Sequence, residues 1–180
     1  MSRIAPLQAP YPAAVQQDFE RIMGPGREPL VLFRTIATQE RAWKKFTAAG
    51  LLDKGPLPMR EREIVIDRTC ARNGCEYEWG VHAVAFGRPL GLNEAQLRAT
   101  VHGSAADPCW SDRQRLLVRL VDELHDTGTI SDELWAELAA GWEAAALVEL
   151  VATVGFYHLV SFAANAFRVD LEEHAERFPA

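Results

Sequence analysis

The sequence has few of the features that mark secreted proteins. Its 180 residues include only three cysteines, and an odd number cannot all be paired within one chain. Because disulfide bonds persist in oxidising compartments, we expect a reducing cytoplasm, where each cysteine is either a packing group or a reactive thiol. Residues 1–19 also contain no apolar segment of signal-peptide length. The sequence therefore predicts a cytoplasmic protein.

Positive charge is also sparse. The chain has 19 Lys and Arg residues against 25 Asp and Glu residues, which gives a net charge of −6, and the basic residues are scattered. We therefore expect no nucleic-acid partner and no binding to an anionic membrane surface. The longest apolar stretch, residues 144–167, is interrupted by Glu149, His158 and Asn165. We interpret it as a buried helix and not as a membrane span.

No segment alternates apolar and polar residues over the length of a strand, so the predicted class is all-α, a multi-helix bundle. We treat residues 1–180 as a single domain. Residues 1–12 contain three prolines and are predicted to form an extended arm. Apolar periodicity and capping boxes predict short helices over residues 15–23 and from residue 93, and further helices over residues 30–49, 60–71, 75–86, 111–126, 131–140 and 143–168.

Three chemically reactive side chains occur at helical spacing in the stretch GCEYEWGVH. Cys75, Glu78 and His82 are three and four residues apart, so a helix would place them on one stripe. Cys75 follows an Asn-Gly pair that ends the preceding helix, and a helix N-terminus favours the thiolate form of a cysteine. A nearby histidine can take the thiol proton, and a carboxylate can orient the imidazole. The stripe is thus a candidate catalytic site.

Glu63 is a second carboxylate that can reach this stripe. It lies on the preceding predicted helix, and a helical hairpin would fold it back against the helix of Cys75. The residues alone leave two other interpretations open. Cys75 and His82 can be core residues beside an exposed Glu78, or Glu78 and His82 can bind a metal together with His158 or Glu63. Because two ligands do not make a site, we expect no metal, and no motif indicates a cofactor.

The segment REREIVI, followed by NGCEYEW and then by His82, resembles the carboxymuconolactone decarboxylase family, which includes alkylhydroperoxidase D. The resemblance covers residues 57–101, where Glu63, Cys75 and His82 match the family spacing. It implies an all-helical fold that assembles as a homo-oligomer, either a trimer or a hexamer. It also implies a small-molecule substrate bound near the subunit contacts.

The same resemblance indicates the walls of the substrate pocket. It places Tyr77 and Trp79 beside the site. His158 lies in the apolar C-terminal segment, where a lone histidine is either a hydrogen-bonded core residue or a pocket residue. We therefore expect a substrate pocket lined by Tyr77, Trp79 and His158.

One position departs from the family pattern. In alkylhydroperoxidase D the site is a Cys-x-x-Cys pair whose second cysteine attacks the peroxide, and here that position is Glu78. Our first hypothesis is thiol-dependent hydroperoxide reduction of the peroxiredoxin type, an antioxidant activity in which Cys75 attacks instead. The resulting sulfenic acid would be resolved by Cys70 or by an external thiol reductant.

A second hypothesis does not need the thiol. Decarboxylation or isomerisation of a small acidic lactone requires a proton donor and electrostatic stabilisation, and His82 can be the acid with Glu63 or Glu78 tuning it. A third hypothesis is a non-catalytic oligomer that binds a small molecule in the family pocket. The loss of the attacking cysteine favours this third hypothesis, whereas the presence of Glu63 and His82 favours an enzyme.

Overall fold

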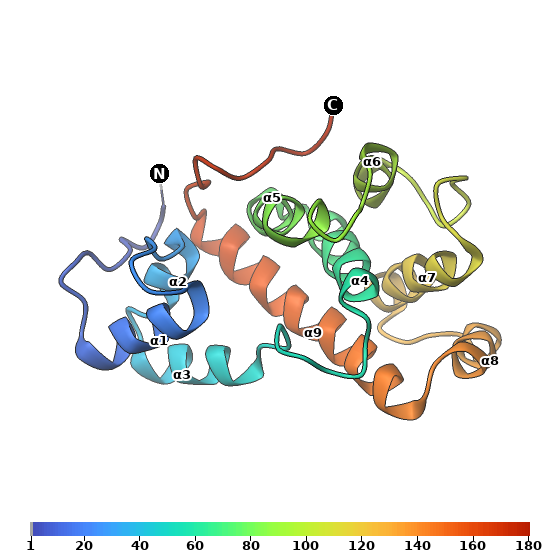
Figure 1. Ribbon diagram of the computed structural model, residues 1–180, viewed down its shortest axis with the longest axis horizontal. Coiled ribbons are helices and arrows are strands. Elements are labelled where there is room, and N and C mark those ends of the chain that lie inside the picture. The colour runs from blue at the N-terminus through green and yellow to red at the C-terminus, as the bar shows by residue number, and fades with distance from the viewer. Residues whose placement is uncertain (1) are drawn as a thin grey trace.

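The computed structural model describes residues 2–180, and every regular element in this part of the chain is a helix, as predicted. The helices are α1 (Ala13–Met23), α2 (Val31–Ile36), α3 (Glu40–Ala49), α4 (Met59–Arg72), α5 (Glu76–His82), the π-helical turn η1 (Ala83–Gly87), α6 (Glu94–His102), α7 (Asp112–Thr127), α8 (Asp132–Gly141) and α9 (Ala144–Phe167). Helices α4 and α9 lie at the centre, with α1, α2 and α3 on one side and α6, α7 and α8 on the other (Figure 1).

Helix α4 is the centre of the core. It packs against α5, α6, α7 and α9, and every residue from Arg62 to Cys70 is buried. A helix buried on all sides must satisfy its charged side chains internally. Arg62 donates to two backbone carbonyls in the loop before α4, at 2.8 and 2.9 Å. Arg68 forms a two-bond ion pair with Asp122 on α7, at 2.8 and 2.9 Å. These partners fix the position of α4 within the core.

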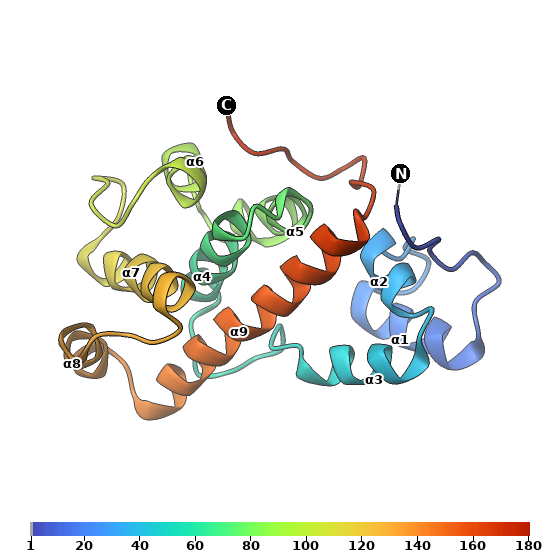
Figure 2. The ribbon, with the colours of Figure 1, turned by 180° about the vertical axis from the view of Figure 1, so that it is seen from behind.

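Helix α9 links the two sides of the molecule. It runs from α8 past α4 to the N-terminal helices, as the two opposite views show (Figures 1 and 2). It has 24 residues and, by length and composition alone, it is apolar enough to cross a membrane. Of its most apolar 18-residue window, 44% is buried inside the protein, where Leu150, Val154 and Tyr157 join the core. The predicted helix over residues 143–168 is therefore confirmed, and part of it is a core helix.

The predicted single helix over residues 30–49 is wrong, because the chain turns between α2 and α3. The hydroxyls of Thr35 and Thr38 donate to backbone carbonyls at 2.8 and 2.7 Å. The side chain of Gln39 then accepts a hydrogen bond from the Ala42 N–H and so caps α3. Polar side chains that bond to the backbone compete with a continuous helix, and apolar spacing does not reveal this competition.

The predicted helix over residues 75–86 also differs in its second half, where α5 passes into the π-helical turn η1. Such turns are frequent at functional sites. The two predicted capping boxes are confirmed. Asn93 and Ser111 each accept a hydrogen bond from the backbone three residues later, and a glutamine side chain at that position bonds back.

Residues 2–12 contain no helix, and they are held by their own chain. The N–H of Arg3 donates to the carbonyl of Phe167 at 2.7 Å, and the N–H of Leu7 donates to the carbonyl of Arg34 at 3.1 Å. The segment predicted as an extended arm therefore connects the end of α9 to α2.

Candidate active site

A tight turn between α4 and α5 builds the centre of the site. Gly74 has a φ angle of 60°, in the left-handed region that favours glycine. The turn lets the N–H of Cys75 donate to the carbonyl of Cys70 at 2.8 Å, so that Cys75 occupies the N-terminal capping position of α5. The resulting helical hairpin brings Glu63 on α4 against His82 on α5.

Glu63, His82, Tyr157 and Glu78 form one buried polar group. The Nδ1 atom of His82 lies 2.7 Å from Oε2 of Glu63. The Nε2 atom of His82 lies 3.1 Å from the hydroxyl of Tyr157 on α9 and 3.4 Å from Oε1 of Glu78. The structure thus brings together three of the four residues that the sequence suggested as catalytic, and it adds a tyrosine from a helix far along the chain.

The proton on His82 is held by its two carboxylate neighbours. Burial by itself lowers the pKa of a histidine, because it disfavours the charged form. Here the charge and hydrogen bond of Glu63, followed by those of Glu78, outweigh burial and raise the pKa of His82 to about 10. His82 is therefore an imidazolium at neutral pH, and both ring nitrogens donate. Because its Nε2–H can donate to the oxygen of Tyr157, the hydroxyl proton of Tyr157 is available to another acceptor.

A cavity of about 600 Å³ opens beside this polar group. Its walls come from α1, α2, α3, α5, η1, α9 and the loop after α3. Four phenylalanines, Phe33, Phe46, Phe86 and Phe156, form part of the lining, and its charged residues are Arg21, Asp53 and Glu78. Ligand pockets commonly have this size and mostly apolar walls. The cavity therefore suits a small and largely apolar molecule.

Glu78 is the carboxylate that belongs to both the cavity wall and the polar group. Its Oε1 atom faces His82, whereas its Oε2 atom is buried and has no hydrogen-bond partner within residues 2–180. Buried polar atoms normally have partners, so an unpaired one on a residue of the cavity wall is a candidate partner for a bound molecule. Tyr157 also lines the cavity. Near Nε2 of His82, the cavity wall therefore has one hydrogen-bond acceptor, Glu78, and one donor, the hydroxyl of Tyr157.

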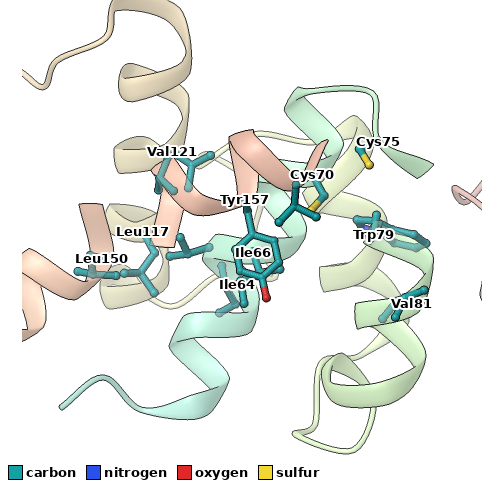
Figure 3. Close-up of a cluster of buried hydrophobic side chains, with 14 of the residues drawn as sticks. Ile64, Ile66, Cys70, Cys75, Trp79, Val81, Leu117, Val121, Leu150 and Tyr157 are labelled. Carbon is teal, nitrogen blue, oxygen red and sulfur yellow. The ribbon is translucent and has the colours of Figure 1, made fainter. Parts of the chain in front are cut away.

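Cys75 and Cys70 lie in the cluster of buried hydrophobic side chains (Figure 3). Neither of them lines the cavity. Burial raises the pKa of Cys75 to about 11, although the nearby backbone of Glu78 and the side chain of Ser161 act in the opposite direction. Burial also raises the pKa of Cys70 well above its ordinary value, and the nearby Cys75 adds to this effect. The thiolate expected at the start of α5 is therefore not favoured, because burial outweighs the effect of the helix end.

Tyr77 and Trp79 do not line the cavity either. The hydroxyl of Tyr77 accepts from the N–H of Leu32 at 3.0 Å and donates to Glu172, so it ties α5 to α2 and to the segment after α9. The indole N–H of Trp79 donates to the hydroxyl of Thr100 on α6 at 2.9 Å. Both residues of the expected substrate pocket are thus engaged in the packing of α5.

His158, the third residue expected in the pocket, is placed against α7. Its Nε2 atom lies 3.2 Å from Nδ1 of His125, and its Nδ1 atom lies 2.9 Å from the carbonyl of Val154. His158 is therefore paired outside the group of Glu63 and His82. Across residues 2–180, no cluster of three His, Cys, Asp or Glu side chains is placed to hold a metal ion.

The sequence did not reveal Tyr157 as a residue of the site, nor the aromatic lining of the cavity. Phe33 and Phe46 have the helical spacing of core residues, and an aromatic side chain at a cavity has the same spacing as one in the core. Only the tyrosine at position 157, in an apolar helix, could have indicated a contact with the site. A buried tyrosine hydroxyl needs a hydrogen-bond partner, and the histidine of the candidate site was available.

Known proteins share both the central segment and the fold. The carboxymuconolactone decarboxylase family model matches residues 40–123, which include Glu63, Cys75, Glu78 and His82. An uncharacterized peroxidase-related protein from Silicibacter sp. TM1040 has the same fold, with a TM-score of 0.80 and 19% identity over 99% of this chain and 96% of that one. No curated protein sequence matches this chain closely enough to inform its function.

Two further solved structures share this fold. An uncharacterized peroxidase-related protein with an alkylhydroperoxidase AhpD core, from Ralstonia eutropha JMP134, has a TM-score of 0.82 and 19% identity over 96% of this chain and 93% of that one. A cysteine-to-alanine variant of the debrominase Bmp8, in complex with 2,3,4-tribromopyrrole, has a TM-score of 0.75 and 15% identity over 97% of this chain and 94% of that one.

These similarities define an all-helical fold of the alkylhydroperoxidase D-like type. Residues 40–123 match the model of the carboxymuconolactone decarboxylase family, in agreement with the resemblance predicted over residues 57–101. At 15–19% identity the solved structures share the fold, and the reaction of this chain must be argued from its own site.

Proposed function

We propose that this protein is an enzyme of the isomerase type, which moves a proton within a small unsaturated lactone or a similar carbonyl compound by general acid–base catalysis. The observation that carries the proposal is the position of Glu78. By the family resemblance, it stands where alkylhydroperoxidase D has its attacking cysteine. Glu78 is a lining residue of the cavity and has an unpaired Oε2 atom, whereas Cys75 does not line the cavity.

Glu78 is suited to be the base. In the proposed step, its Oε2 atom takes a proton from the carbon next to the substrate carbonyl, and the electrons of the C–H bond move onto the carbonyl oxygen as an enolate forms. Tyr157 donates a hydrogen bond to that oxygen, and the charge of His82 behind Tyr157 strengthens this donor. Glu78 then returns the proton to a different carbon of the conjugated system. The proton is conserved, and nothing is oxidised or reduced.

Glu63 is a positioning residue in this mechanism. It accepts the hydrogen bond from Nδ1 of His82 at 2.7 Å and keeps the imidazole charged. With Nδ1 held by Glu63, the Nε2–H of His82 is directed at Tyr157 and Glu78. Replacement of Glu63 would therefore weaken the donor at Tyr157 without removing a group that touches the substrate.

The charges around the cavity favour a neutral substrate over a di-acid. The charged lining residues are one arginine, Arg21, and two carboxylates, Asp53 and Glu78. Arg62, which precedes Glu63, donates to two backbone carbonyls, and Arg68 and Arg72 form ion pairs with aspartates of α7. Without a pair of free cations to hold two carboxylates, isomerisation is supported better than decarboxylation of a di-acid.

The aromatic lining supports a ring-shaped substrate. Four phenylalanines face a cavity of about 600 Å³, which has room for a small ring compound. The debrominase Bmp8, which shares the fold, binds the small ring 2,3,4-tribromopyrrole. We propose that the enzyme acts in the cytoplasm, because its three free cysteines suit a reducing compartment.

A second candidate function is hydroperoxide reduction by Cys75, with Cys70 as the resolving thiol. It is favoured by the proximity of the two cysteines, which share a backbone hydrogen bond of 2.8 Å. Cys75 would attack the peroxide oxygen and release an alcohol, and Cys70 would displace water to form a disulfide that an external thiol reduces. The burial of both thiols and their raised pKa values place this function second.

Deuterium exchange tests the proposed base without a known substrate. Unsaturated five-membered lactones would be incubated with the protein in D₂O, and NMR would follow the loss of carbon-bound protons. We expect the wild type to accelerate exchange and Glu78→Gln to lose about 100-fold or more of that rate. Cys75→Ser, the matched control, should keep it.

A parallel assay with an organic hydroperoxide and excess dithiothreitol separates the two candidates. Peroxide consumption that disappears in Cys75→Ser, together with no lactone exchange, would contradict the acid–base proposal and support the thiol peroxidase. If neither reaction occurs while the lactone still binds, the chain is a non-catalytic binding protein.

A further inference from the structure

One face of α9 is apolar and uncovered. Its large side chains are Val148, Val151, Leu159 and Phe162, which are 70%, 42%, 50% and 60% exposed. At about 100° per residue, all four lie within about 40° of Gly155 around the helix axis, so they form a single stripe. Ala144, Ala152 and Ala166 are also exposed, and no exposed residue of the stripe is charged. An apolar surface of this length on a soluble chain marks an interaction site.

The centre of the stripe is a glycine that no contact within the single chain explains. Gly155 is exposed in the middle of a long helix, and a Cβ atom added to it would meet nothing within 4 Å. Glycine is the poorest helix former after proline, so alanine would serve the isolated chain better. A glycine at the centre of an apolar stripe is explained if another backbone approaches closely there.

The large residues are placed symmetrically about this glycine. Val151 and Leu159 lie four residues before and after Gly155, and Val148 and Phe162 lie seven residues before and after it. A two-fold axis through Gly155 would therefore lay Val148 of one copy against Phe162 of the other, and Val151 against Leu159. This is the self-complementary arrangement that a two-fold interface requires.

The charges at the two ends of α9 fix the relative direction of the two copies. Exposed Glu143 precedes the helix, and exposed Arg168 follows it. Antiparallel pairing brings each Glu143 near the other copy's Arg168 and also opposes the two helix dipoles favourably. Parallel pairing would place like charges together at both ends. The exposed Trp135 lines a hollow of about 400 Å³ at the start of α9, which extends the same apolar face.

We propose that the exposed face of α9 is a two-fold interface with a second copy of this chain, in which the two α9 helices pack antiparallel and cross at Gly155. This interface does not depend on the proposed reaction. A two-fold contact is absent from a simple trimer and present in a hexamer built from three such pairs. Of the two assemblies that the family resemblance implies, the proposal therefore favours the hexamer over the trimer.

A charge-exchange experiment tests the pairing. Val148→Glu and Phe162→Lys should each weaken self-association by about 100-fold or more, because each leaves a charge inside an apolar contact. The double variant should restore the wild-type assembly, because the two new charges face each other across the axis. Sedimentation equilibrium measures the mass, and each single variant should halve the number of chains in the wild-type particle.

The controls separate this result from misfolding. Both residues are exposed, so circular dichroism and the thermal transition should show each single variant folded. Met59→Glu places the same charge at an exposed apolar residue outside the stripe and should leave the mass unchanged. A wild-type protein that sediments as one 20.0 kDa chain would overturn the proposal, as would single variants that keep the wild-type mass. A single wild-type chain that cosediments with phosphatidylglycerol vesicles would assign this face to lipid.

Discussion

At the scale of the residue, the electrostatics of the site depend on the proton that charges the imidazole of His82. His82 is buried between Glu63 and Glu78, and these carboxylates keep its imidazole charged at neutral pH. A buried charge persists only when its partners compensate for the lost hydration. The charge of His82 therefore depends on the folded core, and the strength of Tyr157 as a hydrogen-bond donor depends on that charge.

This linkage predicts how stability varies with pH. The pKa of His82 is raised from 6.5 to about 10 in the folded protein, so the stabilisation is complete below pH 6.5 and is lost as pH rises toward 10. The free energy of unfolding should fall by up to about 1.4 kcal/mol per pH unit in this range. Urea unfolding between pH 6.5 and 9 measures the slope. Above pH 9 the raised pKa of Cys75 adds a dependence of the same sign.

The matched variant for this measurement is His82→Asn, which keeps a polar side chain and removes the titration. It should unfold with a flatter pH profile in the same window. If its slope equals that of the wild type, another group carries the pH dependence and the charged state assigned to His82 is wrong.

The sequence could predict part of this site because its spacing is local. Glu78 and His82 are one helical turn apart, and one hairpin brings Glu63 to them. Tyr157 follows His82 by 75 residues and meets it only through the packing of α9, which no local pattern encodes. The burial of Cys75 also results from tertiary packing, because neighbouring helices determine whether the end of a helix faces solvent or the core.

At the scale of the element, the α4–α5 hairpin determines the register of the site. The turn between the two helices depends on Gly74. The hydrogen bond from the Cys75 N–H to the Cys70 carbonyl then fixes the position of the start of α5 relative to the end of α4. The sequence indicated this break correctly from its Asn-Gly pair. It did not indicate the break between α2 and α3, because the hydroxyls and the amide that cause it are compatible with a helix until their partners are known.

Gly74→Ala should destabilise the protein by about 1 kcal/mol, because an alanine is strained at a φ of 60°. Gly50→Ala is the control. Its φ is −65°, and an added Cβ would come no closer than 3.8 Å to its neighbours, so the change should be close to neutral. Equal unfolding free energies for the two variants, measured in urea, would contradict the role given to the turn.

At the scale of the whole molecule, the segment after α9 holds α5 in place, and it runs past α5 in both ribbon views (Figures 1 and 2). Glu172 accepts the hydrogen bond from Tyr77, and the N–H of Glu176 donates to the carbonyl of Gly80 at 3.3 Å. Glu176 also pairs with Arg88, just after η1. The position of Glu78 and His82 thus depends on residues about a hundred positions further along the chain.

Removal of residues 172–180 should therefore loosen α5 more than α4 or α7. Hydrogen–deuterium exchange would show this as faster exchange of the α5 amides. Gly80→Ala should give the same result in the full chain, because its Cβ would lie 2.0 Å from the carbonyl oxygen of Glu176. Glu173→Ala, at an exposed neighbour, is the control. Unchanged protection of α5 in both test variants would contradict this role.

The dependence of α5 on this later segment also sets the order in which the site can be assembled during translation. A ribosome delivers the chain from its N-terminus, so Glu63, Glu78 and His82 leave it well before Tyr157 and Glu172. A nascent chain that stops before α9 contains Glu78 and His82, but it lacks Tyr157, which contacts His82, and the later segment that contacts α5. The candidate site is therefore completed late in synthesis, through residues made long after Glu78.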